Sequence, residues 1–456
     1  MTRPNSEAEY LARMVPASVS GAVMGRRGML KTAALGAGAA FGLPAALAAC
    51  GGDSTATGTG AGASAAAASG AVTIGSNQSD PVPKQVLVDV LAGFKTANPG
   101  IDVTVNTVDH NTFQENINNY LQGRPDDAFT WFAGYRARFF ASKGLAGDIS
   151  DVWKGLTGYT EAFKTASTGD DGKQYFVPVS YYPWAVFYRK SLWKKNGYTE
   201  PKTLDEFTAL CKQMQTDGLE PLAFADKDGW PAMGMFDILN MRVNGYQYHV
   251  DLMAGKEAWD SPQVTKVFDT WTSLIPYQQK APLGRTWQEA AQSLQQKKTG
   301  MCYFGLFIAQ QFKEDEQEDL DFFTFPEIDS VIGSDALDAP IDGWMMAKKP
   351  KNEGAAKAFL GYLGTGAAGT VVGKSDPGTL AANSEADTAS YGALKKKAAE
   401  IVGSAKSIAQ FLDRDTRPDF ASTVMIPSIQ SYLKKPADIA SILKSIEAQK
   451  KSIFTS

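Results

Sequence analysis

Strand-like apolar runs alternate with helix-like spacings in the region that follows residue 71. The runs at 72–75, 101–105 and 128–132 have the length and apolar content of strands. Between them, 83–97 and 112–121 carry apolar residues three and four positions apart, as on one face of a helix. Strands that alternate with helices in this way predict a parallel sheet covered by helices.

The remainder of the chain continues both patterns. Helices are expected at 204–215 and 354–364, a buried strand at 299–307, and a mainly helical stretch at 387–456. No repeat of fixed period is visible in the sequence. We therefore predict an α/β fold. Its body of about 385 residues is too large for one ordinary core and suits two lobes.

The first fifty residues have the pattern of an export signal. Arg26 and Arg27 precede an apolar, Ala- and Gly-rich stretch, which ends in small residues just before Cys50. Basic residues, a weakly hydrophobic segment and small residues before a cleavage point form a signal peptide. The arginine pair resembles the twin-arginine export signal, and the residues up to Cys50 resemble the lipoprotein cleavage box. We predict a signal peptide over 1–49.

An uncleaved membrane anchor is the alternative reading of this stretch, because a span needs about 20 apolar residues. The Ala and Gly content, Pro44 and the cysteine box favour cleavage. Residues 50–71 then form a lipidated Cys50 and a flexible tether of Gly, Ser, Ala and Thr. The expected location is the outer face of the bacterial cell membrane, to which the lipid anchors the protein.

Composition excludes several function classes. With 45 basic and 49 acidic residues, the formal charge of −4 provides no basic surface for nucleic acid. Two histidines and three cysteines are too few for a zinc site of the usual kind, so no metal and no cofactor are predicted. Cys211 and Cys302 are interpreted as two buried thiols, although a disulfide would be possible outside the cell.

Motifs for catalysis are weak, and no catalytic residues are assigned. Residues 368–375 fit a relaxed phosphate-loop pattern, but a helical pattern precedes them where a strand is required. The sequence contains no serine-hydrolase elbow and no zinc-protease motif.

Four segments combine aromatic rings with planar polar groups near Gly or Pro: 129–136, 177–184, 229–245 and 342–344. One face of a pyranose ring consists of C–H groups and stacks on an aromatic ring, whereas its hydroxyls need polar partners. Large aromatic side chains are also common in cores, which is the simpler reading of any single tryptophan. Four such segments together favour a pocket for a neutral sugar.

The chain resembles the carbohydrate-binding family of extracellular solute-binding proteins of bacterial ABC importers, which is related to maltose-binding protein. The segments that carry the resemblance follow in a familiar order and spacing: 124–145, 175–192, 201–207, 297–301 and 352–360. The resemblance implies a two-lobed fold of the periplasmic-binding-protein type, with hinge crossings near Pro183, Phe325 and Pro377. Lobe one would comprise 72–183 plus 327–375, and lobe two 184–326 plus 376–456.

The resemblance also implies the function and the partners. A neutral mono- or oligosaccharide would be held between the lobes and delivered to the permease subunits by a protein that is not an enzyme and is expected to be a monomer. Rings and polar groups at the following positions are expected to bind it: Gln78, Trp131, Tyr135, Arg136, Tyr181, Tyr182, Trp184, Trp230, Asp237, Arg242, Phe307, Asp342, Gly343 and Trp344.

Three points stay open at this stage. The family's stacking aromatic in the C-terminal helices has no clear counterpart, and Tyr432 or Phe420 could serve. The same fold could bind a charged solute such as a polyamine or an organic anion. A secreted glycosidase is the third possibility, although it would need two carboxylates that face each other across a cleft.

Overall fold

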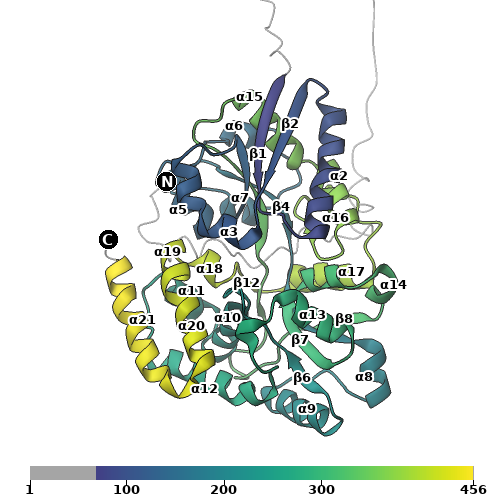
Figure 1. Cartoon of the computed structure of the whole chain (residues 1–456), viewed down its shortest axis with the longest axis vertical. Coiled ribbons are helices and arrows are strands. Elements are labelled where there is room, and N and C mark those ends of the chain that lie inside the picture. Colours follow the sequence, from purple (N-terminus) through teal and green to yellow (C-terminus); the bar gives the residue numbers. More distant parts are fainter. Residues whose placement is uncertain (1–67, 455–456) are drawn as a thin grey trace, which may run out of the picture.

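The computed structural model describes residues 68–454, and the chain forms two bodies, each built on its own sheet (Figure 1). The predicted signal peptide with Arg26 and Arg27, and Cys50, lie outside the described residues. Strand β1 begins at Gly70, two residues before the expected strand start at Val72, because Gly70 and Ala71 already pair with Ile101 and Asp102.

The first sheet has six strands in the order β11-β4-β10-β3-β1-β2. Strand β1 pairs in parallel with β2 and β3, as predicted, whereas β10 runs antiparallel to both of its neighbours. The sheet is therefore mixed, because β10 enters from the side of the second body. The strands are β1 (Gly70–Ser76), β2 (Ile101–Thr107), β3 (Ala128–Phe132), β4 (Phe176–Tyr181), β10 (Ile341–Met346) and β11 (Leu380–Ala381).

The helices of the first body lie between these strands in the sequence. The stretch expected as one helix at 112–121 is two short helices that meet at Asn116. The phosphate-loop lookalike at 368–375 lies within α16 and forms no loop. The helices are α2 (Pro81–Ala97), α3 (His110–Glu115), α4 (Ile117–Gln122), α5 (Tyr135–Ser142), α6 (Ser150–Trp153), α7 (Glu161–Ala166), α15 (Glu353–Leu363) and α16 (Gly366–Ser375).

The second sheet has four strands in the order β6-β7-β5-β8. Strand β7 is buried along its whole length, as expected for 299–307, and pairs in parallel with β6 and antiparallel with β5. Strands β9 and β12, which lie far apart in the sequence, form a separate two-stranded parallel sheet. The strands are β5 (Trp184–Arg189), β6 (Glu220–Ala223), β7 (Thr299–Gly305), β8 (Leu320–Phe323), β9 (Ala336–Asp338) and β12 (Ser407–Ala409).

Helix α9 (Leu204–Thr216) shows how local sequence builds the second body. The Thr203 side chain accepts a hydrogen bond from the Glu206 backbone N–H and caps the helix, and two acidic residues occupy the first turn. Phe207, Cys211 and Met214 then fall on one buried face. Cys211 and Cys302 are both buried free thiols, which confirms the interpretation from the sequence.

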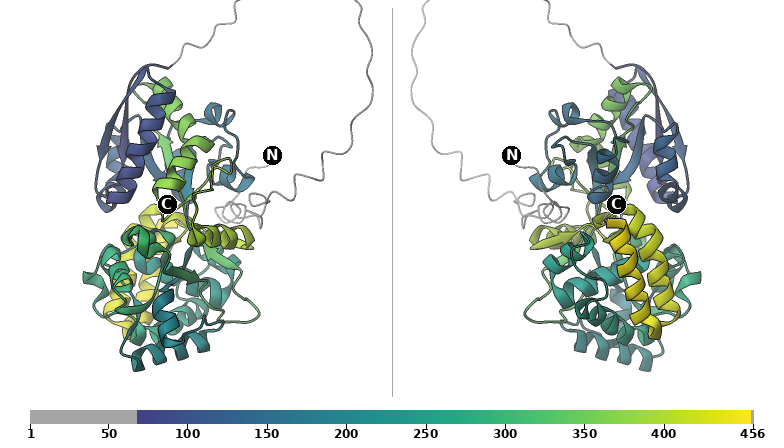
Figure 2. Two further views of the ribbon diagram at one scale, coloured as in Figure 1. Left: turned by 90° about the vertical axis from the view of Figure 1, so that its right-hand side faces the viewer. Right: turned by 90° about the vertical axis from the view of Figure 1, so that its left-hand side faces the viewer.

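The remaining helical elements of the chain cover the second sheet, and the C-terminal ones lie against this body in both side views (Figure 2). They are α8 (Lys190–Asn196), α10 (Pro231–Asn244), α11 (Tyr246–Met253), α12 (Pro262–Leu274), η2 (Ile275–Tyr277), η3 (Pro282–Gly284), α13 (Trp287–Gln295), η4 (Leu306–Gln311), α14 (Glu314–Gln317), α17 (Ala393–Ser404), α18 (Leu412–Asp415), α19 (Pro418–Phe420), η5 (Ala421–Met425), α20 (Ile426–Lys434), η6 (Pro436–Asp438) and α21 (Ile439–Phe454).

The chain passes between the two sheets between β4 and β5, between β8 and β10, and after β11. The exact division into lobes stays a prediction. Because Leu380 and Ala381 pair with β4, strand pairing favours a third boundary after Ala381 rather than after Ser375. Within residues 68–454, no helix combines the length and the apolar composition that a membrane crossing needs.

Candidate ligand-binding site

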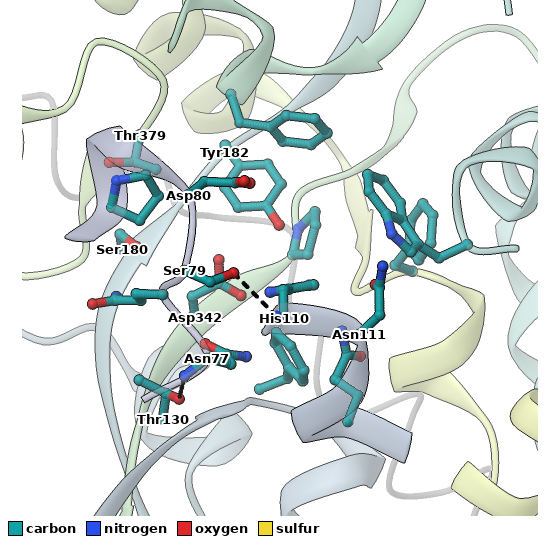
Figure 3. A pocket seen from close by; sticks show the side chains of 18 of the residues that line it. Asn77, Ser79, Asp80, His110, Asn111, Thr130, Ser180, Tyr182, Asp342 and Thr379 are labelled. Carbon is teal, nitrogen blue, oxygen red and sulfur yellow. Dashed lines mark hydrogen bonds between the residues drawn. The ribbon is translucent and has the colours of Figure 1, made fainter. Parts of the chain in front are cut away.

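A cavity of about 330 Å³ lies between the two bodies, and residues from both sheets line it (Figure 3). On the first body, its wall is made where β1, β3 and β4 end. Ligands of open α/β sheets bind beyond the carboxyl ends of the strands. On the second body, the wall comes from the segments that follow β6 and β7 and from the start of β5.

The loops after β1 and β2 are tied to each other and to β3. The backbone N–H of Asn77 donates to Thr130 Oγ1 at 2.8 Å, and the backbone N–H of His110 donates to Ser79 Oγ at 3.1 Å (Figure 3). Asp80 stands at the start of α2 but does not cap it with its side chain, which instead accepts a hydrogen bond from Gln288 Nε2 at 3.2 Å. Asp80 and Gln288 thus connect the first body with α13 of the second.

Aromatic rings form the wall on the second body. Phe307 meets Trp287 edge to face, with ring centroids 5.0 Å apart, and contacts Trp230 and Trp184 in the same manner. Trp184 also packs on Phe411 at 4.8 Å. Edge-to-face contacts of this kind are favourable and hold the rings in place. Trp230 and Phe307 remain partly exposed, so their rings offer surface to a ligand.

Phe411 has an unusual backbone for a non-glycine residue, with a φ of 108°. It lies between β12 and α18, and this conformation places its ring against Trp184 in the cavity wall. Backbone strain of this kind is common at binding sites, where the surrounding structure holds it.

Two arginines organise the charges at the cavity. Arg414 Nη1 donates to Asp342 Oδ1 at 2.8 Å, and Arg414 Nη2 donates to the Tyr182 hydroxyl at 3.1 Å. Behind the wall, Arg136 Nη1 donates to Asp413 Oδ2 at 3.1 Å and to Gln114 Oε1 at 2.8 Å. Each pair joins α18 to the first body, so α18 is a contact between the two bodies at the cavity.

Burial and these arginines shift the pKa values of neighbouring groups. Burial raises the pKa of Asp342, and Arg414 partly offsets the shift. Burial, together with the charges of Arg414 and Arg136, lowers the pKa of His110 to about 4. His110 is therefore neutral at pH 7 and offers the cavity an uncharged ring.

The structure brings nine of the fourteen predicted ligand-binding residues to the cavity: Gln78, Trp131, Tyr182, Trp184, Trp230, Phe307, Asp342, Gly343 and Trp344. Two of them point mainly into cores, since Trp131 is 1% and Trp344 2% exposed. Their rings pack on Phe140 at 5.4 Å and on Phe359 at 5.2 Å.

Gly343 has a structural reason to be glycine. A Cβ atom there would lie 2.0 Å from the carbonyl oxygen of Val177, so only glycine lets β10 approach β4 this closely. The pairing of β10 with β4 is irregular at this point, between Asp342 and Gly343.

Five predicted residues do not line the cavity, because each is engaged elsewhere. Tyr135 packs on Phe139 and under Arg138, and Tyr181 packs on Phe163. Arg136 contacts the cavity residues Gln114 and Asp413 rather than the cavity itself.

The other two of the five hold the chain together. Asp237 Oδ2 accepts a hydrogen bond from the backbone N–H of Leu412 at 2.7 Å and so tethers α18. Arg242 donates to the carbonyl oxygens of Phe325 at 3.0 Å and Ala336 at 2.6 Å, at both ends of a segment that links the bodies. Residues 325–336 are thereby clamped to α10.

Sequence reasoning missed several lining residues: Asn77, Asp80, Asp109, His110, Asn111, Asp228, Trp287, Gln288, Asp376, Phe411, Asp413 and Arg414. The polar residues that follow β1 and β2 could have been found from their places at strand ends. Phe411 gives no local signal. Phe411 is an aromatic residue of the C-terminal region that lines the cavity, whereas Tyr432 and Phe420 are fully buried and do not line it.

No group of three or more His, Cys, Asp or Glu side chains in the described part of the chain could hold a metal ion.

The family model for bacterial extracellular solute-binding proteins matches residues 78–370. Among curated relatives, the chain is 25% identical over 252 residues to an uncharacterized ABC transporter extracellular-binding protein of Pyrococcus horikoshii, covering 54% of this chain and 56% of the relative. It is 27% identical over 164 residues to a probable sugar-binding periplasmic protein of Mesorhizobium japonicum, covering 34% and 39%. The matched region thus spans about half, or less, of these curated relatives.

Solved structures match over nearly their whole length. The bacterial solute receptor AcbH superposes with a TM-score of 0.82 and 48% identity, covering 84% of this chain and 99% of AcbH, which is described as having an exclusive substrate preference for β-D-galactopyranose. A chitin oligosaccharide binding protein has a TM-score of 0.77 and 20% identity, covering 84% and 99%, and shows the shared fold. The resemblance seen in the sequence is confirmed, and the chain belongs to the family of bacterial extracellular solute-binding proteins.

Proposed function

We propose that the protein is the sugar receptor of an ABC importer, which captures a neutral sugar between its two bodies and delivers it to a permease. One observation carries this proposal: the partly exposed rings of Trp230 and Phe307 line the same cavity as polar side chains such as Asn77 and Asn111. Aromatic rings together with hydrogen-bonding groups suit the apolar face and the hydroxyl edge of a pyranose.

The first candidate ligand is a single D-galactopyranose. AcbH, for which that preference is described, shares 48% of its residues with this chain over 99% of its length. The cavity volume of about 330 Å³ also lies near the lower end of the range of about 300–1,000 Å³ usual for ligand pockets. Both points favour one sugar unit over a long oligosaccharide.

Closure of the two bodies would follow from the way the ligand contacts both. A sugar that contacts Asp80 of the first body and Trp230 of the second gains its full set of contacts only when the bodies meet. Such a ligand stabilises the closed form by its differential affinity for that form. The clamp that Arg242 places on residues 325–336 would make the crossing segment a stiff hinge.

We propose binding without catalysis. Glycoside hydrolysis needs one carboxyl as an acid and a second as a nucleophile or base. Asp342 and Asp413 are each paired with an arginine, which holds both in place as structural charges. A chromogenic galactoside that stays intact in the presence of the protein supports a binding role, whereas product formation that is lost in Asp80→Asn would contradict it.

The proposed location is the outer face of the cell membrane, with the protein exported through the Arg26-Arg27 signal and anchored by a lipid on Cys50. We propose a monomer that docks on permease subunits.

Isothermal titration calorimetry of the purified full chain tests the proposal. The panel contains neutral hexoses and disaccharides together with a polyamine and an organic acid. D-galactose should bind with one site per chain, and at about 100 times its Kd it should stabilise the protein by about 2.7 kcal/mol in a thermal scan. Binding heat that is seen only with the polyamine or the organic acid, and with none of the sugars, would refute the proposal of a sugar receptor.

A further inference from the structure

We propose that the pocket rejects sugars that carry a negative charge, and that three carboxylates in its lining, Asp80, Asp109 and Asp228, enforce the rejection. The inference rests on the proposed function and adds the charge class of the sugar. The pocket would admit neutral and amino sugars and would exclude uronic acids and sugar phosphates.

The charge balance of the lining carries the first step. The ionisable groups that line the cavity are six aspartates, one arginine and the neutral His110: Asp80, Asp109, Asp228, Asp342, Asp376, Asp413 and Arg414. Neither lysine nor glutamate lines it. The acidic groups therefore outnumber the single cation that faces the ligand.

The second step is that the cations at the cavity are already engaged. Arg414 is paired with Asp342 at 2.8 Å, and Arg136 with Asp413 at 3.1 Å. An anionic ligand would have to compete with these carboxylates for its counter-charge. The ion pairs found among residues 68–454 include none of Asp80, Asp109 and Asp228, so these three charges are not cancelled by contact pairs.

The third step is that the three carboxylates line the cavity from both bodies. Asp80 and Asp109 follow β1 and β2 of the first sheet, and Asp228 follows β6 of the second. Burial raises the pKa of Asp80 and Asp109 raises it further. Burial also raises the pKa of Asp228, where Lys227 opposes the shift and Asp109 and Asp80 add to it. The charge of Asp109 therefore acts on both of the other carboxyls, whereas its own pKa is lowered by the backbone N–H of Thr112, so Asp109 stays ionised and can repel an anionic ligand.

The rings beside them favour the opposite charge. Trp230 and Trp287 line the cavity on the side of Asp228, and the face of an indole attracts a cation. An ammonium group in place of a hydroxyl would find carboxylate acceptors and ring faces. A carboxylate in the same place would meet the negative charges of Asp80, Asp109 and Asp228, and its own charge would be partly desolvated.

Calorimetry with matched sugars tests the inference on the full chain. The sugars are D-galactose, D-galactosamine, D-galacturonic acid and the neutral amide of D-galacturonic acid, which has nearly the size of the acid without its charge. The glucose and mannose sets are measured in parallel. We expect the acid to bind at least 100-fold more weakly than its amide, and the amine to bind within about tenfold of the neutral sugar.

Variants then locate the effect. In the double variant Asp80→Asn/Asp228→Asn, the Kd of the acid divided by the Kd of the amide should fall by at least tenfold. Asp109→Asn provides a second variant that retains folding, because asparagine can cap α3 as Asp109 does through the Thr112 N–H. Asp260→Asn, an exposed aspartate outside the cavity, should leave the ratio unchanged.

The outcomes separate the inference from the function on which it rests. An acid that binds as tightly as its amide, or a ratio that no variant changes, overturns the inference and leaves the sugar receptor standing. A panel in which no sugar of any charge binds overturns the proposed function and the inference together.

Discussion

Trp230 is the residue for which we propose the most direct contact with the ligand, because it lines the cavity and keeps part of its ring exposed. It precedes Pro231, the first residue of α10. Its neighbour Phe307 meets it edge to face at 5.9 Å, which leaves ring surface for a sugar.

Trp230→Ala should lower the affinity for D-galactose by about 10- to 100-fold, because burial of a large apolar side chain is worth about 1.5–3 kcal/mol. Trp230→Phe retains a ring and should lose less. Titration calorimetry measures both. Tyr198→Ala removes a partly exposed ring outside the cavity and should keep the wild-type Kd. Equal losses in Trp230→Ala and Tyr198→Ala would mean that the effect is on folding.

Arg136 and Arg242 show how a residue that suits a ligand can serve the fold. Both are buried arginines in segments rich in aromatic residues, and both bind protein groups instead of lining the cavity. Arg136 lies 5.0 Å from the centre of the Trp131 ring and orients two cavity residues, Gln114 and Asp413. It is a positioning residue.

Three elements bring a cluster of buried carboxyls together behind the cavity. Asp237 of α10, Asp338 of β9 and Asp415 of α18 are buried beside Arg242 and Tyr303. Neither oxygen of Asp338 has a hydrogen-bond partner among the described residues. Burial raises the pKa of all three carboxyls, and that of Asp415 reaches about 7.

The sign of the pH effect follows from these shifts. A carboxyl with a raised pKa binds more protons in the folded than in the unfolded chain, so its contribution to stability falls as pH rises from about 4 through the folded pKa. Asp338→Asn keeps the shape and removes one charge. The variant should therefore gain stability over the wild type as pH rises from 5 to 8.

Urea unfolding at pH 5, 6, 7 and 8 measures this difference, and a gain of about 1–3 kcal/mol at pH 8 is expected from removal of one unpaired buried group. Asp260→Asn is the control, since Asp260 is exposed. A difference between Asp338→Asn and wild type that does not change with pH would show that the cluster does not hold protons.

At the scale of the whole molecule, α18 connects the two bodies. Its Asp413 and Arg414 pair with Arg136 and Asp342 of the first body, while Asp237 of α10 holds its first turn. We call this short helix a latch because it has contacts on both sides, and we predict that the pocket keeps its shape only while these contacts are formed.

Asp413→Asn should weaken the latch, because it leaves the buried Arg136 guanidinium without its carboxylate. We expect a larger radius of gyration for the unliganded protein in small-angle X-ray scattering, and a Kd for D-galactose about tenfold higher. Asp170→Asn is the matched control, since it removes the 2.8 Å pair with Arg138 of the same helix α5 within the first body. An unchanged radius and Kd in Asp413→Asn would exclude a latch.

Substitutions near the N-terminus test whether the protein is exported and anchored to the membrane. Cys50→Ser should release the protein from the membrane fraction into the soluble fraction, because serine cannot take the thioether-linked lipid. Replacement of Arg26 and Arg27 by lysines should retain the precursor inside the cell. Cell fractionation with an antibody against the chain measures both, and a Cys50→Ser protein that stays with the membrane would contradict a lipid anchor.

The sequence by itself determined most of the elements, the fold class and the family. Periodicity predicted β3 at 128–132 and the burial of β7, because these patterns depend on near neighbours in the chain. The aromatic segments identified Trp230 and Asp342 as candidates, and the family resemblance identified Phe307; all three line the cavity.

Only the tertiary structure decided which polar residues bind a ligand and which hold the fold. The partners of Arg136, Asp237 and Arg242 lie 277, 175 and 94 residues away along the chain. No local pattern contains such a pairing, since it arises when crossing segments bring distant charges into one low-dielectric interior, where an unpaired charge is costly. For the same physical reason, Phe411 and Arg414 became visible as cavity residues only when the two bodies were placed together.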